Sequence, residues 1–230
     1  MSLGRQYSFW GSLSPLGGLT GAGILIIASA RLSWSVTVVG CLFWVYGLST
    51  FTFGFLLSTP VNKFFPVSGR ISLFTYLAAF FGSVYLFLFW LLCPFAALEV
   101  FVLLMLVPLF CAGSETVQQI SDAFDKSKCE SKPGLNTSPD IFNYVSNAVS
   151  QASSLSLLLV AFSIIREPLS YCSLSFPGTF QGMVTIMYFK ENNFFPIGIF
   201  SQSTGALILM GYIICLYQYS KSRLFPGEYK

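Results

Sequence analysis

Histidine is absent from this sequence of 230 residues. Histidine is the most frequent general base and a common metal ligand, so its absence argues against a self-contained hydrolase or a zinc site. Charged residues are also scarce, at 9% of the chain, whereas a soluble domain carries about 25%. The lysines and arginines are spread along the chain without a cluster, so the net charge of +3 gives no nucleic-acid footprint.

Paired cysteines are lacking as well. The six cysteines are scattered without a Cys-x-x-Cys spacing, and most of them fall within apolar runs. Such thiols are interpreted as reduced, buried side chains that behave as small hydrophobes, in preference to metal ligands.

Apolar residues, in contrast, make up 54% of the chain, and the mean hydropathy is +0.71. A spanning helix needs about 20 apolar residues, because backbone groups in the hydrocarbon core must pair within the protein. The apolar runs here are long and do not alternate with polar residues, which excludes a transmembrane barrel. The sequence therefore predicts an all-α integral membrane protein whose single membrane domain covers residues 1–230.

Six apolar segments predict about six transmembrane helices: 9–30, 34–57, 71–92, 95–112, 141–165 and 195–218. The third and fourth segments form one run in which Glu99 is the only charge. That run is too long for one helix, because a helix rises about 1.5 Å per residue and the hydrocarbon is about 30 Å thick. Cys93 and Pro94 are the expected turn.

The first segment has a second interpretation. Arg5, an apolar stretch and the small residues 28–30 resemble a secretory signal peptide with its cleavage site. Pro15 and four glycines interrupt this stretch, and a second apolar segment follows almost at once. These features favour a retained first helix.

Lysine and arginine in the short loops predict the orientation, because these residues accumulate on the cytoplasmic side. One side would hold the residues Arg5, Lys63, Arg70, Lys126, Lys128, Lys132, Lys221, Arg223 and Lys230. The other side would hold Arg31, Arg166 and Lys190. We therefore expect both termini in the cytoplasm, together with residues 114–140. That segment begins as an amphipathic helix, continues as a loop and separates two parts of three to four helices.

The fifth segment carries amide and small hydroxyl side chains on one helical face: Asn143, Asn147, Ser150, Gln151 and Ser154. In lipid, side chains of this kind usually mediate contacts between helices, which is favoured here over a hydrophilic pathway. Arg166 and Glu167 follow at the far end of the segment. An interfacial ion pair between them is the simplest expectation.

Several motifs, taken in order, resemble the integral membrane subunits of the Rnf and Nqr electron-transport complexes, in particular the E subunit of Rnf and the D subunit of Nqr. FSIIREPLSYCSLSF, with Arg166 and Glu167, resembles the family's Arg-Glu-Ile turn, and STGALILMG, with Gly205, resembles its PPGAFI-x-LG helix. SLSPLGGLTGAG matches the Pro-Leu of GLCPLLAVT at Pro15. The resemblance implies two inverted three-helix repeats with interrupted helices, for which Pro15 and Pro108 are suitable breakers.

The resemblance also implies a [2Fe–2S] cluster shared with a sister subunit, with two thiolate ligands from each chain. The first ligand position reads Ser14 here. The second falls at Leu109 in the simplest alignment, and at Cys111 after a shift of two residues. A serine oxygen is a harder ligand than a thiolate, so we expect the cluster to be absent or labile.

The resulting expectation is a scaffold-like, non-catalytic subunit of an Rnf/Nqr-type ion-translocating complex in the inner (cytoplasmic) membrane. Its partners would be sister Rnf/Nqr membrane subunits and the lipid bilayer, with no nucleic acid. The alternative is a small six-helix transporter or substrate-binding module unrelated to redox chemistry. The alternative would require ionisable groups within the membrane, and the spans contain few of them.

Overall fold

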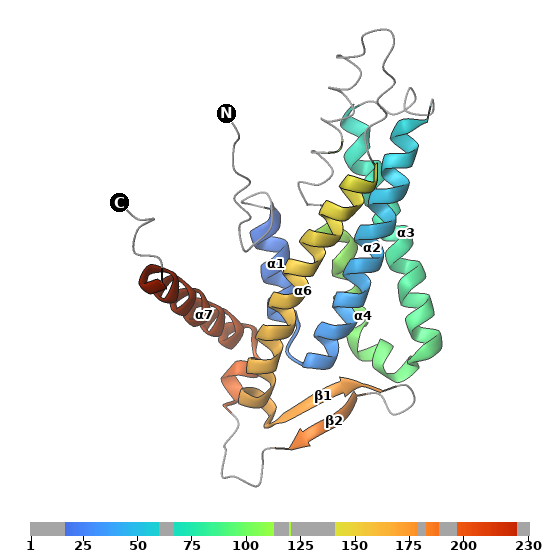
Figure 1. Cartoon of the computed structure of the whole chain (residues 1–230). Coiled ribbons are helices and arrows are strands. Elements are labelled where there is room, and N and C mark those ends of the chain that lie inside the picture. The colour runs from blue at the N-terminus through green and yellow to red at the C-terminus, as the bar shows by residue number, and fades with distance from the viewer. Residues whose placement is uncertain are drawn as a thin grey trace.

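A computed structural model describes residues 17–59, 67–112, 120, 141–178, 183–188 and 197–224. Within these ranges the chain is almost entirely helical (Figure 1). The helices are α1 (Gly17–Ala28), α2 (Leu32–Ser58), α3 (Val67–Leu92), α4 (Pro94–Ala112), α6 (Ile141–Tyr171), the 3₁₀ helix η3 (Gly198–Ser201) and α7 (Ser203–Leu224). A two-stranded antiparallel sheet of β1 (Ser173–Pro177) and β2 (Met183–Tyr188) follows α6.

Helix α2 is the centre of the bundle and packs against α3, α4 and α6. Its buried side chains, which include Val38, Leu42, Val45 and Phe53, meet apolar side chains from all three neighbours. The rings of Phe53 and Phe74 pack edge to face, with their centroids 5.4 Å apart. Since hydrocarbon surrounds such a bundle on the outside, close packing of this kind is what holds the helices together.

Four helices in the described part of the chain are long and apolar enough to cross a membrane: α2, α6, residues Gly69–Leu92 of α3 and residues Pro94–Cys111 of α4. The all-α membrane class is therefore confirmed, but four spans are fewer than the six expected. Helix α1 has 12 residues, which at 1.5 Å per residue is about 18 Å and too short to span hydrocarbon. Most of the additional length predicted for the first segment lies outside the described residues.

The middle of the chain follows the predicted boundaries closely. Helix α3 ends at Leu92 and α4 begins at Pro94, so Cys93 and Pro94 do form the expected turn. Helix α4, however, runs through Pro108 to Ala112, and the interruption expected at Pro108 is absent. The proline ring packs against Gly82 of α3, where an added Cβ would lie 2.5 Å from the ring. Pro108 therefore lies at a close contact between α3 and α4.

The described helix ends gather at two ends of the bundle (Figure 1). The beginnings of α1, α3 and α6 lie at one end, together with the final residues of α2 and α4. The other end holds the turns between α1 and α2 and between α3 and α4, the last residues of α6, and the β1–β2 hairpin. Arg31 and Arg166 therefore lie at the opposite end of the bundle from the last residues of α2 and α4, as the distribution of lysine and arginine predicts. The inverted-repeat relation stays a prediction.

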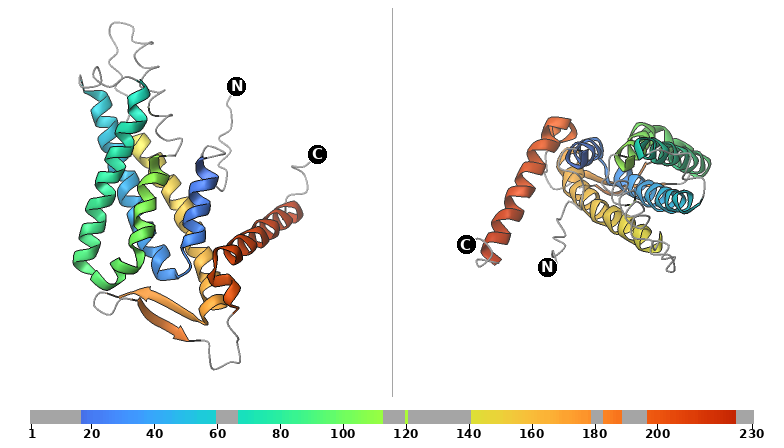
Figure 2. Two further views of the ribbon diagram at one scale, coloured as in Figure 1. Left: turned by 180° about the vertical axis from the view of Figure 1, so that it is seen from behind. Right: turned by 90° about the horizontal axis from the view of Figure 1, so that it is seen from above.

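Two features of the C-terminal part were not expected. The hairpin lies across the lower end of the bundle, and α7 leaves the bundle there and extends away from it (Figures 1 and 2). Helix α7 begins eight residues later than the segment predicted at 195–218, because η3 precedes it. The amphipathic helix predicted after residue 114 lies outside the described residues except for Ile120, which is buried.

Candidate functional site

The last turns of α6 contain two charged side chains that are almost completely buried. Arg166 and Glu167 are each 1% exposed. A charge removed from water is costly unless other groups replace its hydrogen bonds. The two residues and the atoms bound to them are called the Arg166/Glu167 node here.

The guanidinium of Arg166 donates five hydrogen bonds, and all five acceptors are backbone carbonyl oxygens. Two acceptors belong to the last turn of α1, and three belong to η3 and the residue after it. They are Ile27 (2.8 Å) and Ile26 (3.2 Å) for Nη1, Phe200 (2.7 Å) for Nε, and Ser201 (3.2 Å) and Gln202 (3.1 Å) for Nη2. Because a guanidinium has five N–H donors, none is left unused.

The carboxylate of Glu167 is bound in the opposite sense, as an acceptor. Its Oε2 accepts the backbone N–H of Leu32, the first residue of α2, at 2.8 Å. Its Oε1 accepts the backbone N–H of Ser175 at 2.9 Å and the Ser175 hydroxyl at 2.6 Å. The Ser175 hydroxyl also lies 3.1 Å from the hydroxyl of Ser33. The node thereby holds the start of α2 and strand β1 to the end of α6.

The helix dipoles match these charges. The guanidinium caps the carbonyl end of α1, where the dipole is negative, and the carboxylate caps the N–H end of α2, where it is positive. The described residues show no ion pair between Arg166 and Glu167, so the expected interfacial ion pair is wrong. Adjacent helical residues project about 100° apart, which directs the two side chains to different neighbours.

The backbone after Glu167 turns sharply to bring β1 back to that carboxylate. Helix α6 continues past Pro168 and ends at Tyr171. Cys172 then has a positive φ of 51°, and its N–H donates to the Pro168 carbonyl at 3.0 Å. A left-handed residue after the last helical turn is a common helix ending. It places Ser175 within reach of Glu167.

Gly205 joins α7 to the same region. A Cβ added there would lie 2.0 Å from the carbonyl oxygen of Ile199 and 2.6 Å from the Cα of Phe200. The first turn of α7 thus rests directly on the backbone of η3, where only glycine leaves enough room. Arg166 binds the carbonyl of the same residue, Phe200. Three residues singled out by the sequence, Arg166, Glu167 and Gly205, are therefore brought together by the fold.

The predicted cofactor residues do not meet in the same way. Ser14 and Pro15 lie outside the described residues. Cys111 is 0% exposed and lies in the core of the bundle, whereas a ligand shared between two chains must reach the surface. No group of three His, Cys, Asp or Glu side chains comes together within the described ranges. A shared [2Fe–2S] cluster would need only two ligands from this chain, so this absence does not test it, and the ligand roles of Ser14 and Cys111 stay predictions.

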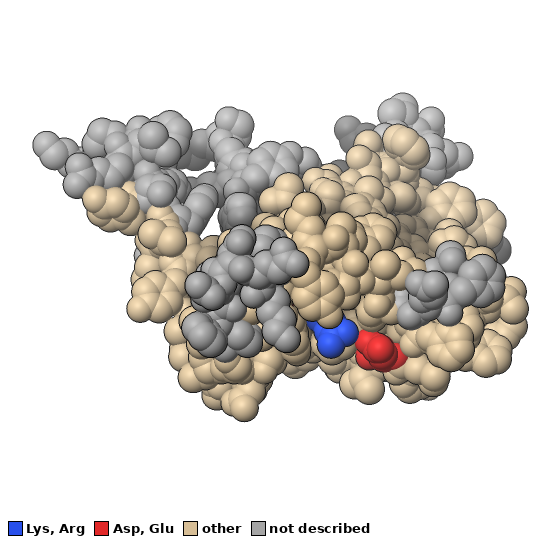
Figure 3. Space-filling view, turned by 90° about the horizontal axis from the view of Figure 1, so that it is seen from below, with Lys and Arg blue, Asp and Glu red and all other residues tan. Residues whose placement is uncertain are grey.

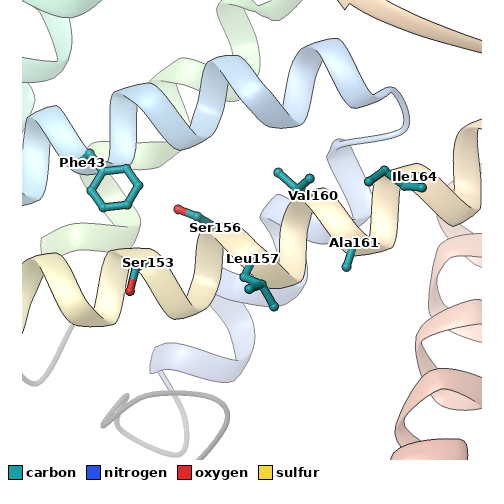
Figure 4. A pocket seen from close by; sticks show the side chains of 7 residues that line it. All are labelled: Phe43, Ser153, Ser156, Leu157, Val160, Ala161 and Ile164. Carbon is teal, nitrogen blue, oxygen red and sulfur yellow. The ribbon is translucent and has the colours of Figure 1, made fainter.

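The polar face of α6 lies on the outside of the bundle. Asn143, Asn147, Ser150 and Ser154 are exposed, and Gln151 is half-buried. Beside this face is a shallow apolar groove of about 460 Å³ between Phe43 of α2 and residues 153–164 of α6. Figure 4 shows Ser156 and Val160 directed from α6 toward α2, with the ring of Phe43 facing them. The outer side of α6 thus combines hydrogen-bonding groups with an apolar recess.

A second pair of charged side chains lies at the end of the bundle that holds the node. Arg31, at the start of α2, and Glu99, on α4, are 3.9 Å apart. The guanidinium of Arg31 also lies over the rings of Trp34 and Tyr171, at 5.7 Å and 5.0 Å from their centroids. In the sequence, Arg31 and Glu99 each stand out as a single charge beside or within an apolar run. No sequence pattern indicates that the two side chains lie close together.

These features define a multi-pass α-helical membrane protein whose buried charges tie helix ends and a hairpin together. Compared with protein-family models and with curated proteins, the chain matches none of them. The proposed function therefore rests on the geometry of the chain and on the motifs that it carries.

Proposed function

We propose that this chain is an integral membrane subunit of a larger complex of the Rnf/Nqr type, in which it supplies packed helices to an ion-translocating electron-transport machine. It contributes no redox centre of its own in this proposal. The observation that carries the proposal is the outward amide and hydroxyl face of α6, a helix long and apolar enough to span the membrane.

Such a face is best explained by a neighbouring helix. Asn147, Ser150 and Ser154 are exposed along α6. The Ser154 hydroxyl donates to the Ser150 carbonyl within α6. Water cannot satisfy the Asn147 amide and the Ser150 hydroxyl in the hydrocarbon core, whereas side chains of a second membrane helix can. Hydrogen bonds of this kind contribute about 0.6 kcal/mol each on average and up to about 2 kcal/mol. Sister membrane subunits are the partners proposed for this face.

The motifs support the particular class of complex. Of the motifs that resemble the Rnf and Nqr subunits, the Arg-Glu turn forms the node, and Gly205 packs against η3, whose carbonyls Arg166 binds. The motifs therefore lie in one region of the fold. The transporter alternative has no comparable support. Both carboxylate oxygens of the buried Glu167 are bound to backbone or hydroxyl groups, and a coupled transporter usually needs an ionisable group that faces a pathway.

Co-purification tests the proposal. A tagged chain extracted in mild detergent should carry sister membrane subunits and flavin-bearing redox subunits with it. The double variant Asn147→Leu/Ser154→Leu should lower their recovery several-fold, because it removes an amide and a hydroxyl from the outer face of α6. The matched control is Ser83→Leu, which removes an exposed hydroxyl from α3. Emergence of the chain alone and monodisperse, while its neighbours are expressed, would contradict the subunit role.

Iron analysis tests the scaffold role separately. The purified complex should lack the iron and sulfide that a shared cluster in this subunit would add, and Cys111→Ala should leave assembly intact. A stoichiometric cluster that is lost in Cys111→Ala or Ser14→Ala would show that this chain carries electrons.

The orientation is part of the same proposal. The chain would lie in the inner (cytoplasmic) membrane with both termini in the cytoplasm, because the loop bias in lysine and arginine is nine to three. Reporter fusions after Lys63, near Lys132 and at the C-terminus should report cytoplasm, and fusions near Arg31 or Lys190 should report the outside. A C-terminus found outside would overturn the orientation without affecting the subunit role.

A further inference from the structure

The Arg31/Glu99 pair presents both signs of charge at the surface. The side chain of Arg31 is 33% exposed and that of Glu99 is 46% exposed. Arg70, Arg166 and Glu167, the other charged residues whose exposure is described, are buried. Figure 3 shows one blue and one red patch in contact on the lower face, surrounded by uncharged surface wherever the chain is described.

Toward the residues that the structure describes, both groups have unused hydrogen-bonding capacity. Their separation of 3.9 Å is too long for a hydrogen bond. No other hydrogen bond to either side chain is formed within the described ranges. The rings of Trp34 and Tyr171 hold the guanidinium by cation–π contact, which consumes none of its N–H donors. The pair is thus positioned by aromatic neighbours and left open on its polar side.

The pair lies near the first residues of α2 and α4, two helices that are long and apolar enough to span a membrane. Arg31 occupies the connection between α1 and α2. Glu99 lies five residues after Pro94, the first residue of α4, which is about 7.5 Å along the helix. On the exposed surface of α4, Leu98 directly precedes Glu99 and Val102 lies about one turn beyond it; these residues are 72% and 71% exposed. A charged pair therefore lies next to an apolar surface, as the headgroup of a lipid lies next to its acyl chains.

We propose that the Arg31/Glu99 pair is a binding site for a phospholipid with a primary ammonium headgroup, of the phosphatidylethanolamine class. The phosphate accepts hydrogen bonds from the guanidinium of Arg31, the ammonium donates to the carboxylate of Glu99, and an acyl chain lies along Leu98 and Val102. This charge complementarity favours a zwitterionic lipid over an anionic one, because Glu99 repels added negative charge. The site is independent of the partner face of α6 and of any electron transport.

Lipid binding to the full-length chain tests the proposal. Native mass spectrometry would compare dioleoyl phosphatidylethanolamine, phosphatidylcholine and phosphatidylglycerol bound to the purified chain. We expect a preference of about two- to fivefold for phosphatidylethanolamine, as the strength of exposed ion pairs implies. Glu99→Gln should abolish that preference, and Arg31→Gln should weaken phospholipid binding, while Arg31→Lys should retain part of it. Equal binding of the three lipids to the unmodified chain would overturn the proposal.

Two further experiments distinguish a bound phospholipid from a soluble ligand and from a purely structural ion pair. O-Phosphoethanolamine offers the same charges without acyl chains and should compete poorly with the phospholipid. Effective competition at equal concentration would show that the site binds a soluble ligand and does not require a lipid. The exchanged variant Arg31→Glu/Glu99→Arg retains an ion pair but moves the cation away from Trp34 and Tyr171. It should lose the lipid preference and keep its thermal stability. If Glu99→Gln behaved like the unmodified chain, the pair would be only a contact between helices.

Discussion

Arg166 and Glu167 lie at the same end of the helix bundle as Arg31 and Glu99, yet the first two side chains are 1% exposed and the second two are 33% and 46% exposed. The buried arginine uses all five of its donors on backbone carbonyls. The exposed arginine has one weak ion pair and two ring contacts. Identical residue types thus serve the fold where they are enclosed and remain open to a ligand where they are not.

The two pairs also differ in the energy that their contacts contribute. Each buried polar group that loses its hydrogen-bond partner costs about 1–3 kcal/mol, and the node contains several such groups. An exposed ion pair contributes about 0.2–1 kcal/mol. Substitutions in the node should therefore affect the stability of the chain, and substitutions in the exposed pair should affect binding.

The largest effect is expected from Arg166→Met. The variant keeps much of the apolar stem and leaves the carbonyls of Ile26, Ile27 and Phe200 without their donor. We expect a loss of at least about 3 kcal/mol in the free energy of unfolding, because each buried carbonyl left without a donor costs about 1–3 kcal/mol; denaturant titration in detergent measures it. Arg166→Lys should recover only part of the loss, since an ammonium has three donors. Stability equal to that of the unmodified chain would show that the node does not hold α1 and η3.

Glu167→Gln should have the next largest effect. The amide retains one acceptor oxygen but presents an NH₂ group to one of the N–H donors of Leu32 and Ser175. Hydrogen bonds to a charged group are worth about 1.5–3 kcal/mol, which is the expected loss. A double-mutant cycle with Ser175→Ala isolates the coupling between α6 and β1. Strictly additive losses would mean that Glu167 and Ser175 do not stabilise one another.

The spans of the bundle could be predicted from the sequence, whereas the node could not. Helices α2, α3 and α4 lie within four residues of the expected segments, because apolar runs and the turn at Cys93 and Pro94 mark them directly. The partners of Arg166 and Glu167 are mostly backbone atoms. Every residue has a backbone carbonyl, whatever its side chain. No sequence motif could therefore indicate that the carbonyls of Ile26 and Phe200 bind the same guanidinium.

Short elements were missed for a related reason. Strand β2 is apolar and exposed on most of its length, including Ile186 and Tyr188. It lacks the alternation that normally identifies a half-buried strand. Glu167 binds Ser175 of β1, eight residues further along the chain, and hydrophobic periodicity does not indicate such a contact. Gly205 was selected through a motif, but the reason for glycine there is the approach of η3.

Gly205→Ala sharpens the comparison by testing η3 from its other side. The added methyl group would lie 2.0 Å from the carbonyl oxygen of Ile199, so α7 or η3 must move. Overpacking of this kind costs about 1–3 kcal/mol. Gly211→Ala is the matched control, because nothing lies within 4 Å of its added Cβ, and better helix propensity should stabilise it by up to about 1 kcal/mol. Equal stability of the two variants would contradict the close contact between α7 and η3.

Arg31→Gln is expected to have the smallest effect on stability. It removes one exposed ion pair with Glu99 and the cation from the rings of Trp34 and Tyr171, contacts worth about 0.2–1 kcal/mol each. In lipid-free detergent the free energy of unfolding of the variant should therefore be close to that of the unmodified chain and far above that of Arg166→Met. Added phosphatidylethanolamine should then stabilise the unmodified chain more than the variant, because a ligand that binds the folded state shifts unfolding in proportion to its occupancy. A loss from Arg31→Gln as large as that from Arg166→Met would mean that exposure does not separate the two pairs.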